Sequence, residues 1–183
     1  MSYVTTAAYT AATAATQRPG IALVTGGKSG IGLAIAKKIA EFPFIDTVVA
    51  VSRSITAKDV EGISTKIHPL AADVSTDTGR ESVVNLVEQL CGSTDNNNGK
   101  QLRFLVHSAG TIEPIESVLK VQPSELRNAM NVNVEAPFFL TTALYPKMKP
   151  VQEDGDAGVP GRVLHVSSGA AHGAPPVGWG CYG

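Results

Sequence analysis

The chain has 183 residues, and its 15 basic and 16 acidic side chains give a formal net charge of −1. A charge so close to zero provides no field that would attract nucleic acid or an anionic membrane surface. Hydrophobic residues make up 43% of the chain, which is typical of a globular domain, and no apolar run reaches the roughly 18 residues that a membrane-spanning helix needs.

Residues 1–18 form an Ala/Thr-rich stretch ahead of the first regular pattern. This stretch contains no acidic residue and one basic residue, Arg18. We interpret it as a disordered tail. The alternative is a mitochondrial transit peptide, but such peptides are rich in arginine and amphipathic. The predicted folded domain therefore covers residues 19–183.

Apolar runs that are typical of buried strands alternate with segments of helical periodicity along the rest of the chain. Helices are expected from about Ile31, after a cap at Ser75, and from a cap at Ser124 to about Met148, with a break at Pro137. The expected strands are residues 21–24, 47–51, 67–72, 102–106 and 162–166. This alternation predicts an α/β fold of the doubly wound Rossmann type, with a parallel sheet between two helical layers and ligands at the carboxyl ends of the strands.

Cysteine and histidine spacing indicates neither a disulfide scaffold nor a metal site. Cys91 and Cys181 allow one bridge, but we expect two reduced thiols because nothing in the sequence indicates a secreted scaffold. His68, His165 and His172 lack the spacing of metal ligands. We therefore expect no bound metal.

A glycine-rich loop, TGGKSGIG, joins the first expected strand to the first helix at residues 25–32. Gly26 permits a tight turn, Gly30 lets the backbone approach a pyrophosphate, and Gly32 allows close packing of the helix. The phosphates would meet free N–H groups at the helix N-terminus. A purely structural turn is the alternative, but the position between a strand and a helix favours nucleotide binding.

The end of the second expected strand indicates which dinucleotide is bound. Domains that bind NAD usually place an acidic residue about 20 positions after the glycine motif. Here that place belongs to Arg53, and a guanidinium matches the 2′-phosphate of NADP(H). Lys28 could add a second positive charge. An arginine that only faces solvent is the alternative, and the sequence favours NADP(H).

These segments, in this order, resemble the classical short-chain dehydrogenases/reductases over residues 20–183. Residues 25–32 match the family's T-G-x-x-x-G-x-G loop, and Asp73-Val74 match the pair that contacts the adenine. Residues 107–110, HSAG, stand where the family usually has Asn-Asn-Ala-Gly. The resemblance implies the following cofactor contacts: Gly26, Lys28, Ser29, Gly30, Ile31, Gly32, Arg53, Asp73, Val74, Ser108, Ala109 and Gly110.

The resemblance also implies an active site and a reaction. Asn133 matches the active-site asparagine, Ser168 the serine that follows the strand GRVLHV, and Tyr182 the tyrosine of a Y-x-x-x-K motif. The implied reaction is hydride transfer between NADP(H) and a small carbonyl or alcohol substrate. Tyr182 would be the general acid/base, Ser168 would hold the reacting oxygen, and Asn133 would hold a water and stabilise a helix break.

The chain departs from the family pattern in three places. His107 and Ser108 replace the usual asparagines, Ser168 and Tyr182 are 14 positions apart instead of about 13, and the sequence stops at Gly183, before the lysine of the motif. We expect a sheet that is incomplete at its C-terminal edge, an open apolar strand at residues 163–166, and little or no turnover by the 183-residue chain alone.

Two hypotheses about function follow. The first is an NADP(H)-dependent oxidoreductase seen as its cofactor-binding portion, and the alternative is a non-catalytic NADP(H)-binding pseudo-enzyme. Residues 167–170 and 179–183 are similar to sepiapterin-reductase-like members. The resemblance further implies a cytoplasmic homodimer or homotetramer without nucleic-acid or membrane partners.

Overall fold

The structure, a computed structural model, describes residues 20–92, 99–117, 119–148 and 160–168. The expected tail, Cys181, His172 and Tyr182 lie outside these residues. The described residues form a parallel five-stranded sheet of order β3-β2-β1-β4-β5. The strands are β1 (Gly20–Thr25), β2 (Ile45–Ser52), β3 (Ile67–Ala71), β4 (Gln101–His107) and β5 (Arg162–His165).

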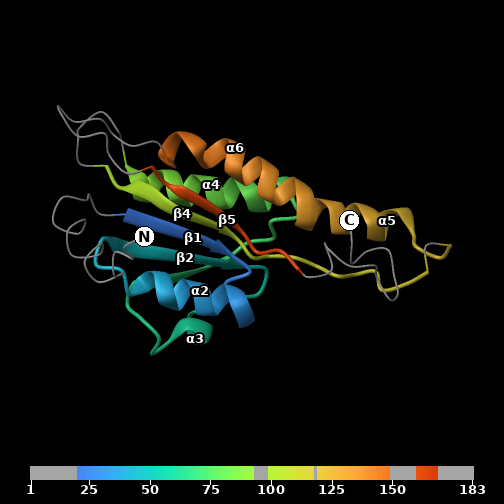
Figure 1. Cartoon of the computed structure of the whole chain (residues 1–183), viewed down its shortest axis with the longest axis horizontal. Coiled ribbons are helices and arrows are strands. Elements are labelled where there is room, and N and C mark those ends of the chain that lie inside the picture. The colour runs from blue at the N-terminus through green and yellow to red at the C-terminus, as the bar shows by residue number, and fades with distance from the viewer. Residues whose placement is uncertain (1–19, 93–98, 118, 149–159, 169–183) are drawn as a thin grey trace, which may run out of the picture.

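Helices cover both faces of the sheet. In Figure 1, α4 and α6 lie on one face and α2 and α3 lie on the other. The helical elements are α2 (Gly30–Ala40), α3 (Ala57–Val60), α4 (Asp77–Cys91), α5 (Pro123–Met130), the π-helical segment η2 (Asn131–Glu135) and α6 (Ala136–Met148). The three-layer Rossmann-type fold predicted from the alternating pattern is confirmed.

The order of the strands creates a crevice beside β1. The chain runs outward from β1 through β2 to β3 and then returns to the other side of β1 as β4. Loops that follow β1 and β4 therefore diverge to opposite faces of the sheet and leave a gap at the carboxyl ends of these strands. The expected ligand position coincides with this gap.

The core has two parts because the side chains of each buried strand alternate between the two faces. In β1, Ile21 and Leu23 pack in the cluster that includes Val83 of α4 and Leu140 of α6. Ala22, next to them in sequence, packs in the cluster on the α2 side. Both neighbours of β1 are parallel strands, so β1 is buried along its length. The apolar run was therefore a dependable signal of a central strand.

Two predicted helix caps are wrong. Helix α4 is capped by Thr76, whose hydroxyl accepts a hydrogen bond from the Gly79 N–H at 3.1 Å, because Ser75 is bound to Asp73 instead. Helix α5 begins at Pro123, with Gln122 and not Ser124 as its N-cap. Proline suits this first position because it has no N–H to leave unpaired.

Near the break expected at Pro137 the chain becomes π-helical, at Asn131–Glu135, and this segment ends two residues before Pro137. The short helix α3 was not predicted. At its start the Asp59 carboxylate accepts hydrogen bonds from the N–H and the hydroxyl of Thr56, and four residues are too few to show a period.

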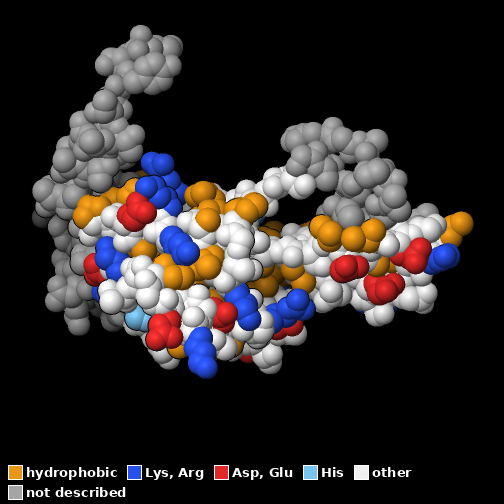
Figure 2. Space-filling view, turned by 90° about the horizontal axis from the view of Figure 1, so that it is seen from below, with side chains coloured by type: hydrophobic (Ala, Val, Ile, Leu, Met, Phe, Trp, Pro, Cys, Tyr) orange, Lys and Arg blue, Asp and Glu red, His pale blue; other side chains and the backbone are white. Residues whose placement is uncertain are grey.

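Strand β5 pairs with β4 alone within the described part of the chain. Its Val163 and Leu164 are 37% and 42% exposed, and Val166, just after the strand, is 37% exposed. Cys91 is buried and is a free thiol. None of the described helices is long and apolar enough to cross a membrane. Figure 2 shows acidic and basic side chains interspersed on the α2 and α3 side, with no large patch of one sign on that side.

Candidate functional site

A pocket of about 430 Å³ lies at the carboxyl ends of β1, β2 and β4. All the predicted cofactor contacts line it except Gly30. The sequence reasoning missed the apolar and neutral residues that complete the wall, because they belong to strand ends and helix faces without a motif. These residues are Val51, Ser52, Ala72, Thr111, Asn128, Val132 and Val166.

The glycine loop is held in a shape that side chains would prevent. Gly26 has φ +70°, and a Cβ there would lie 2.8 Å from the backbone of Ser108 and Ala109. A Cβ on Gly32 would lie 2.3 Å from the carbonyl oxygen of Gly26. Gly30 has φ +56° and open space around its Cα, a left-handed conformation that glycine adopts without strain.

The N-terminus of α2 fits a phosphate group. Ser29 is its N-cap, but the Ser29 side chain makes no capping hydrogen bond, and the first turn has no acidic residue. The first N–H groups of a helix have no partner within the helix, and they attract negative charge. The loop and this helix end together form a cradle that suits a pyrophosphate.

Thr25 ties the two sides of the crevice together, and the sequence reasoning did not single it out as a site residue. Its hydroxyl oxygen accepts hydrogen bonds from the N–H groups of Ser108 and Ala109, both at 3.2 Å, and donates to the Val106 carbonyl at 3.4 Å. Position 25 opens the glycine motif, so the motif itself was the available signal.

Two basic side chains lie at the end of the pocket next to β2. Arg53 is exposed and lines the pocket. The ammonium of Lys28 donates to the carbonyl and hydroxyl of Ser54 at 2.8 and 3.2 Å and lies 3.8 Å from the Asp59 carboxylate. Hydrogen bonds from Thr56, together with the charge of Lys28, hold the pKa of Asp59 below its usual value. Lys28 is therefore shared between the pocket and the loop before α3.

Asn133 joins the helix break to the loop after β4. It lies in η2, where its Oδ1 accepts from the Thr111 N–H and its Nδ2 donates to the Thr111 carbonyl, both at 2.9 Å. Ser168 follows β5 in the described stretch. Tyr182 lies outside the described residues, so the catalytic trio stays a prediction.

His107 is buried at the end of β4, 4% exposed. Its Nε2 lies 2.9 Å from the Thr141 hydroxyl, and its ring stacks on that of His165 at a centroid distance of 4.8 Å. Burial, followed by the charge of His165, lowers the pKa of His107 to about 4. The ring is therefore neutral near pH 7, and it takes the place of an asparagine in the family pattern.

The family model of the short chain dehydrogenases matches residues 20–183. Human dehydrogenase/reductase SDR family member 2, mitochondrial, is 30% identical over 88% of this chain and 53% of its own length. The chain spans about half the length of the curated relatives that it matches.

Solved structures agree with this match. A short-chain dehydrogenase/reductase from Burkholderia vietnamiensis superposes with a TM-score of 0.66 at 27% identity, covering 90% of this chain and 69% of the other. L-sorbose reductase from Gluconobacter frateurii, solved with NADPH and L-sorbose, gives 0.58 at 26% identity over 72% and 48%. The crevice, the glycine cradle and these matches identify the chain as a member of the short-chain dehydrogenase family.

Proposed function

We propose that this chain binds NADP(H) and serves an oxidoreductase that transfers hydride between the nicotinamide and a small carbonyl or alcohol substrate. The observation that carries the choice of cofactor is Arg53, a positive side chain on the pocket wall at the end of β2. A carboxylate there would hydrogen-bond the 2′-hydroxyl of NAD, whereas a guanidinium attracts a 2′-phosphate.

When bound, the nicotinamide supplies or accepts the hydride, and the residues of the chain orient the reactants. In this proposal Tyr182 moves the proton of the reacting oxygen, and Ser168 donates a hydrogen bond to that oxygen. Asn133, fixed to Thr111 by two hydrogen bonds, keeps the helix break beside the pocket. Retention of all three residue types argues for an enzyme over a non-catalytic NADP(H)-binding pseudo-enzyme.

The cellular location and the assembly of the protein are proposed from the family resemblance. We propose a cytoplasmic location and assembly as a homodimer or homotetramer. Helix α6 exposes Phe138, Phe139 and Tyr145 by 63%, 49% and 57%, and such aromatic side chains are enriched at protein interfaces. Similarity to sepiapterin-reductase-like members is our hypothesis for the subgroup.

Calorimetric titration of the chain with NADPH and with NADH tests the choice of cofactor. We expect tighter binding of NADPH, and we expect Arg53→Ala to weaken NADPH binding about tenfold while NADH binding stays within twofold. A hydrogen bond to a charged group contributes about 1.5 kcal/mol or more, which corresponds to this factor. Equal affinity for both cofactors, or equal loss of both in Arg53→Ala, would exclude the proposed role of Arg53.

A further inference from the structure

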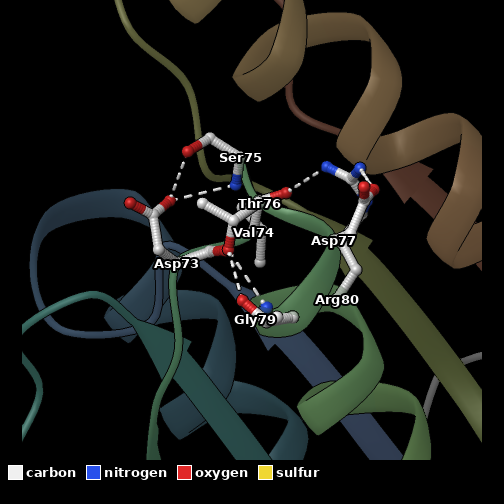
Figure 3. A network of polar contacts seen from close by, with 8 residues as sticks. Asp73, Val74, Ser75, Thr76, Asp77, Gly79 and Arg80 are labelled. Atoms are coloured by element: carbon white, nitrogen blue, oxygen red, sulfur yellow. Dashed lines mark hydrogen bonds and ion pairs between the residues drawn. The ribbon is translucent and has the colours of Figure 1, made fainter.

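Arg80 is a buried charge that none of the sequence motifs explains. It lies in the first turns of α4 and is 8% exposed. Its Nη1 donates to the carbonyl of Val74 at 2.9 Å, and its Nη2 pairs with the Asp77 carboxylate. Its guanidinium also lies over the ring of Phe139 on α6, 5.6 Å from the ring centre. A charge is costly to bury without partners, and Arg80 has three; Figure 3 shows those with Val74 and Asp77.

The contact with Val74 connects Arg80 to the candidate cofactor site. Val74 and Asp73 both line the pocket, on the turn between β3 and α4. Arg80 thus lies behind this turn, away from the pocket lining, because the pocket wall does not include it. Any effect of Arg80 on a ligand in the pocket must pass through the shape of the turn.

Most polar groups of this turn form hydrogen bonds within the turn or with the start of α4. The carbonyl oxygen of Asp73 accepts from the Thr76 N–H at 3.1 Å and from the Thr76 hydroxyl at 2.9 Å. One carboxylate oxygen of Asp73, Oδ1, accepts from the N–H and hydroxyl of Ser75 at 3.0 and 2.7 Å. The carbonyl of Val74 is held by Arg80. Figure 3 shows these bonds within the turn and between the turn and the start of α4.

The orientation of the peptide planes then follows. In a trans peptide the N–H points opposite to the carbonyl of the same plane. The carbonyl of Asp73 is directed to Thr76, so the N–H of Val74 is directed away from α4. Among the described residues no hydrogen bond is found for this N–H or for the second carboxylate oxygen of Asp73. Because Asp73 and Val74 both line the pocket, this donor and this acceptor are the polar groups of the turn that a ligand there could reach.

Close packing keeps α4 against this turn. A Cβ at Gly79 would lie 1.9 Å from the carbonyl oxygen of Asp73, so only glycine permits the approach. The next residue, Arg80, then reaches Val74, while Phe139 supports the guanidinium from the neighbouring helix. The turn is thus fixed from two helices.

We propose that Arg80 is a positioning residue for the adenine end of the cofactor. It holds the carbonyl of Val74 so that the Val74 N–H and the open oxygen of Asp73 face the edge of the adenine ring. The inference rests on the proposed binding of NADP(H), and it adds a residue that contacts neither the cofactor nor the substrate. Asp77, whose side chain is 87% exposed, contributes less to this geometry than Val74 does, because water screens its carboxylate.

The test uses Arg80→Met, which keeps the length of the apolar stem and removes the guanidinium. The matched control is Asp77→Asn, which removes the ion pair and leaves the bond to Val74. We expect Arg80→Met to weaken the binding of NADPH and of adenosine 2′,5′-bisphosphate by the same factor, about tenfold. Asp77→Asn is expected to bind both ligands with an affinity within about twofold of the wild type. The NADPH/NADH ratio stays unchanged, since Arg53 is intact.

Circular dichroism and urea unfolding report whether Arg80→Met is folded, and Phe139→Leu offers a milder change that removes only the ring beneath the guanidinium. Phe139→Leu is expected to weaken the binding of both ligands about two- to threefold. If folded Arg80→Met and Phe139→Leu bind both ligands as tightly as the wild type, Arg80 is structural and the inference is wrong. If the wild type binds neither cofactor, the proposed function fails with it.

Discussion

Gly32→Ala is expected to abolish measurable NADPH binding. The added Cβ would meet the carbonyl oxygen of Gly26 at 2.3 Å and the carbonyl carbon at 2.8 Å, and both are backbone atoms that cannot rotate away. The loop must therefore open, and the N–H groups at the start of α2 lose their arrangement. We expect at least a hundredfold weaker binding by calorimetry and a loss of about 3 kcal/mol in the free energy of unfolding, the upper range for overpacking.

Gly62→Ala is the matched control, because Gly62 lies outside the pocket lining and has open space around its Cα. The left-handed φ of +71° at Gly62 costs a non-glycine residue about 1 kcal/mol. We expect this small loss of stability, with binding of NADPH within about twofold of the wild type. Similar losses of binding in both variants would mean that any loss of stability weakens binding and that the contact of Gly32 with Gly26 has no special part.

Acidification is expected to destabilise the fold through His107. The pKa of His107 is lowered to about 4 by burial and by the charge of His165, whereas an unfolded histidine titrates near 6.5. Between these values the unfolded chain binds more protons than the folded chain. The contribution of His107 to the free energy of unfolding is therefore complete above about pH 6.5 and is lost as the pH falls towards 4. From pH 7.5 to pH 5, His107 alone is expected to lower the free energy of unfolding by about 2 kcal/mol.

Urea unfolding of the wild type and of His107→Asn at the two pH values isolates this share. Asparagine does not titrate, and any constant loss of the contact with Thr141 cancels between the two pH values. Between the two pH values we expect the free energy of unfolding to fall by about 2 kcal/mol more in the wild type than in His107→Asn. The effects of other titrating groups cancel in this difference. An identical pH dependence in both proteins would show that His107 does not carry the effect.

The sheet could be predicted because its strands are buried on both faces. The run Thr47 to Val51 needs no alternation to be identified, and it lies inside the observed strand Ile45–Ser52. The glycine loop was equally readable, since the turn at Gly26 and the contact of Gly32 restrict these positions to glycine. Signals of this kind come from the local backbone, which the sequence determines directly.

Residues that act through tertiary contacts were harder to find. Ser75 is a good N-cap by residue type, but Asp73 captures its hydroxyl. Lys28 was assigned to the cofactor alone, while Ser54 and Asp59, distant in sequence, hold its ammonium. For Arg80 a signal did exist: it lies three residues before Val83 on the apolar face of α4, where a charge requires a partner.

Hydrogen–deuterium exchange of the wild-type chain with and without NADPH tests the central claim most directly, that the pocket at the carboxyl ends of β1, β2 and β4 holds the cofactor. We predict slower exchange of the amides in residues 26–33, 72–75 and 108–111, with unchanged exchange in residues 83–91 of α4. Saturable binding of NADPH without protection of these three loops would place the cofactor elsewhere and contradict the account.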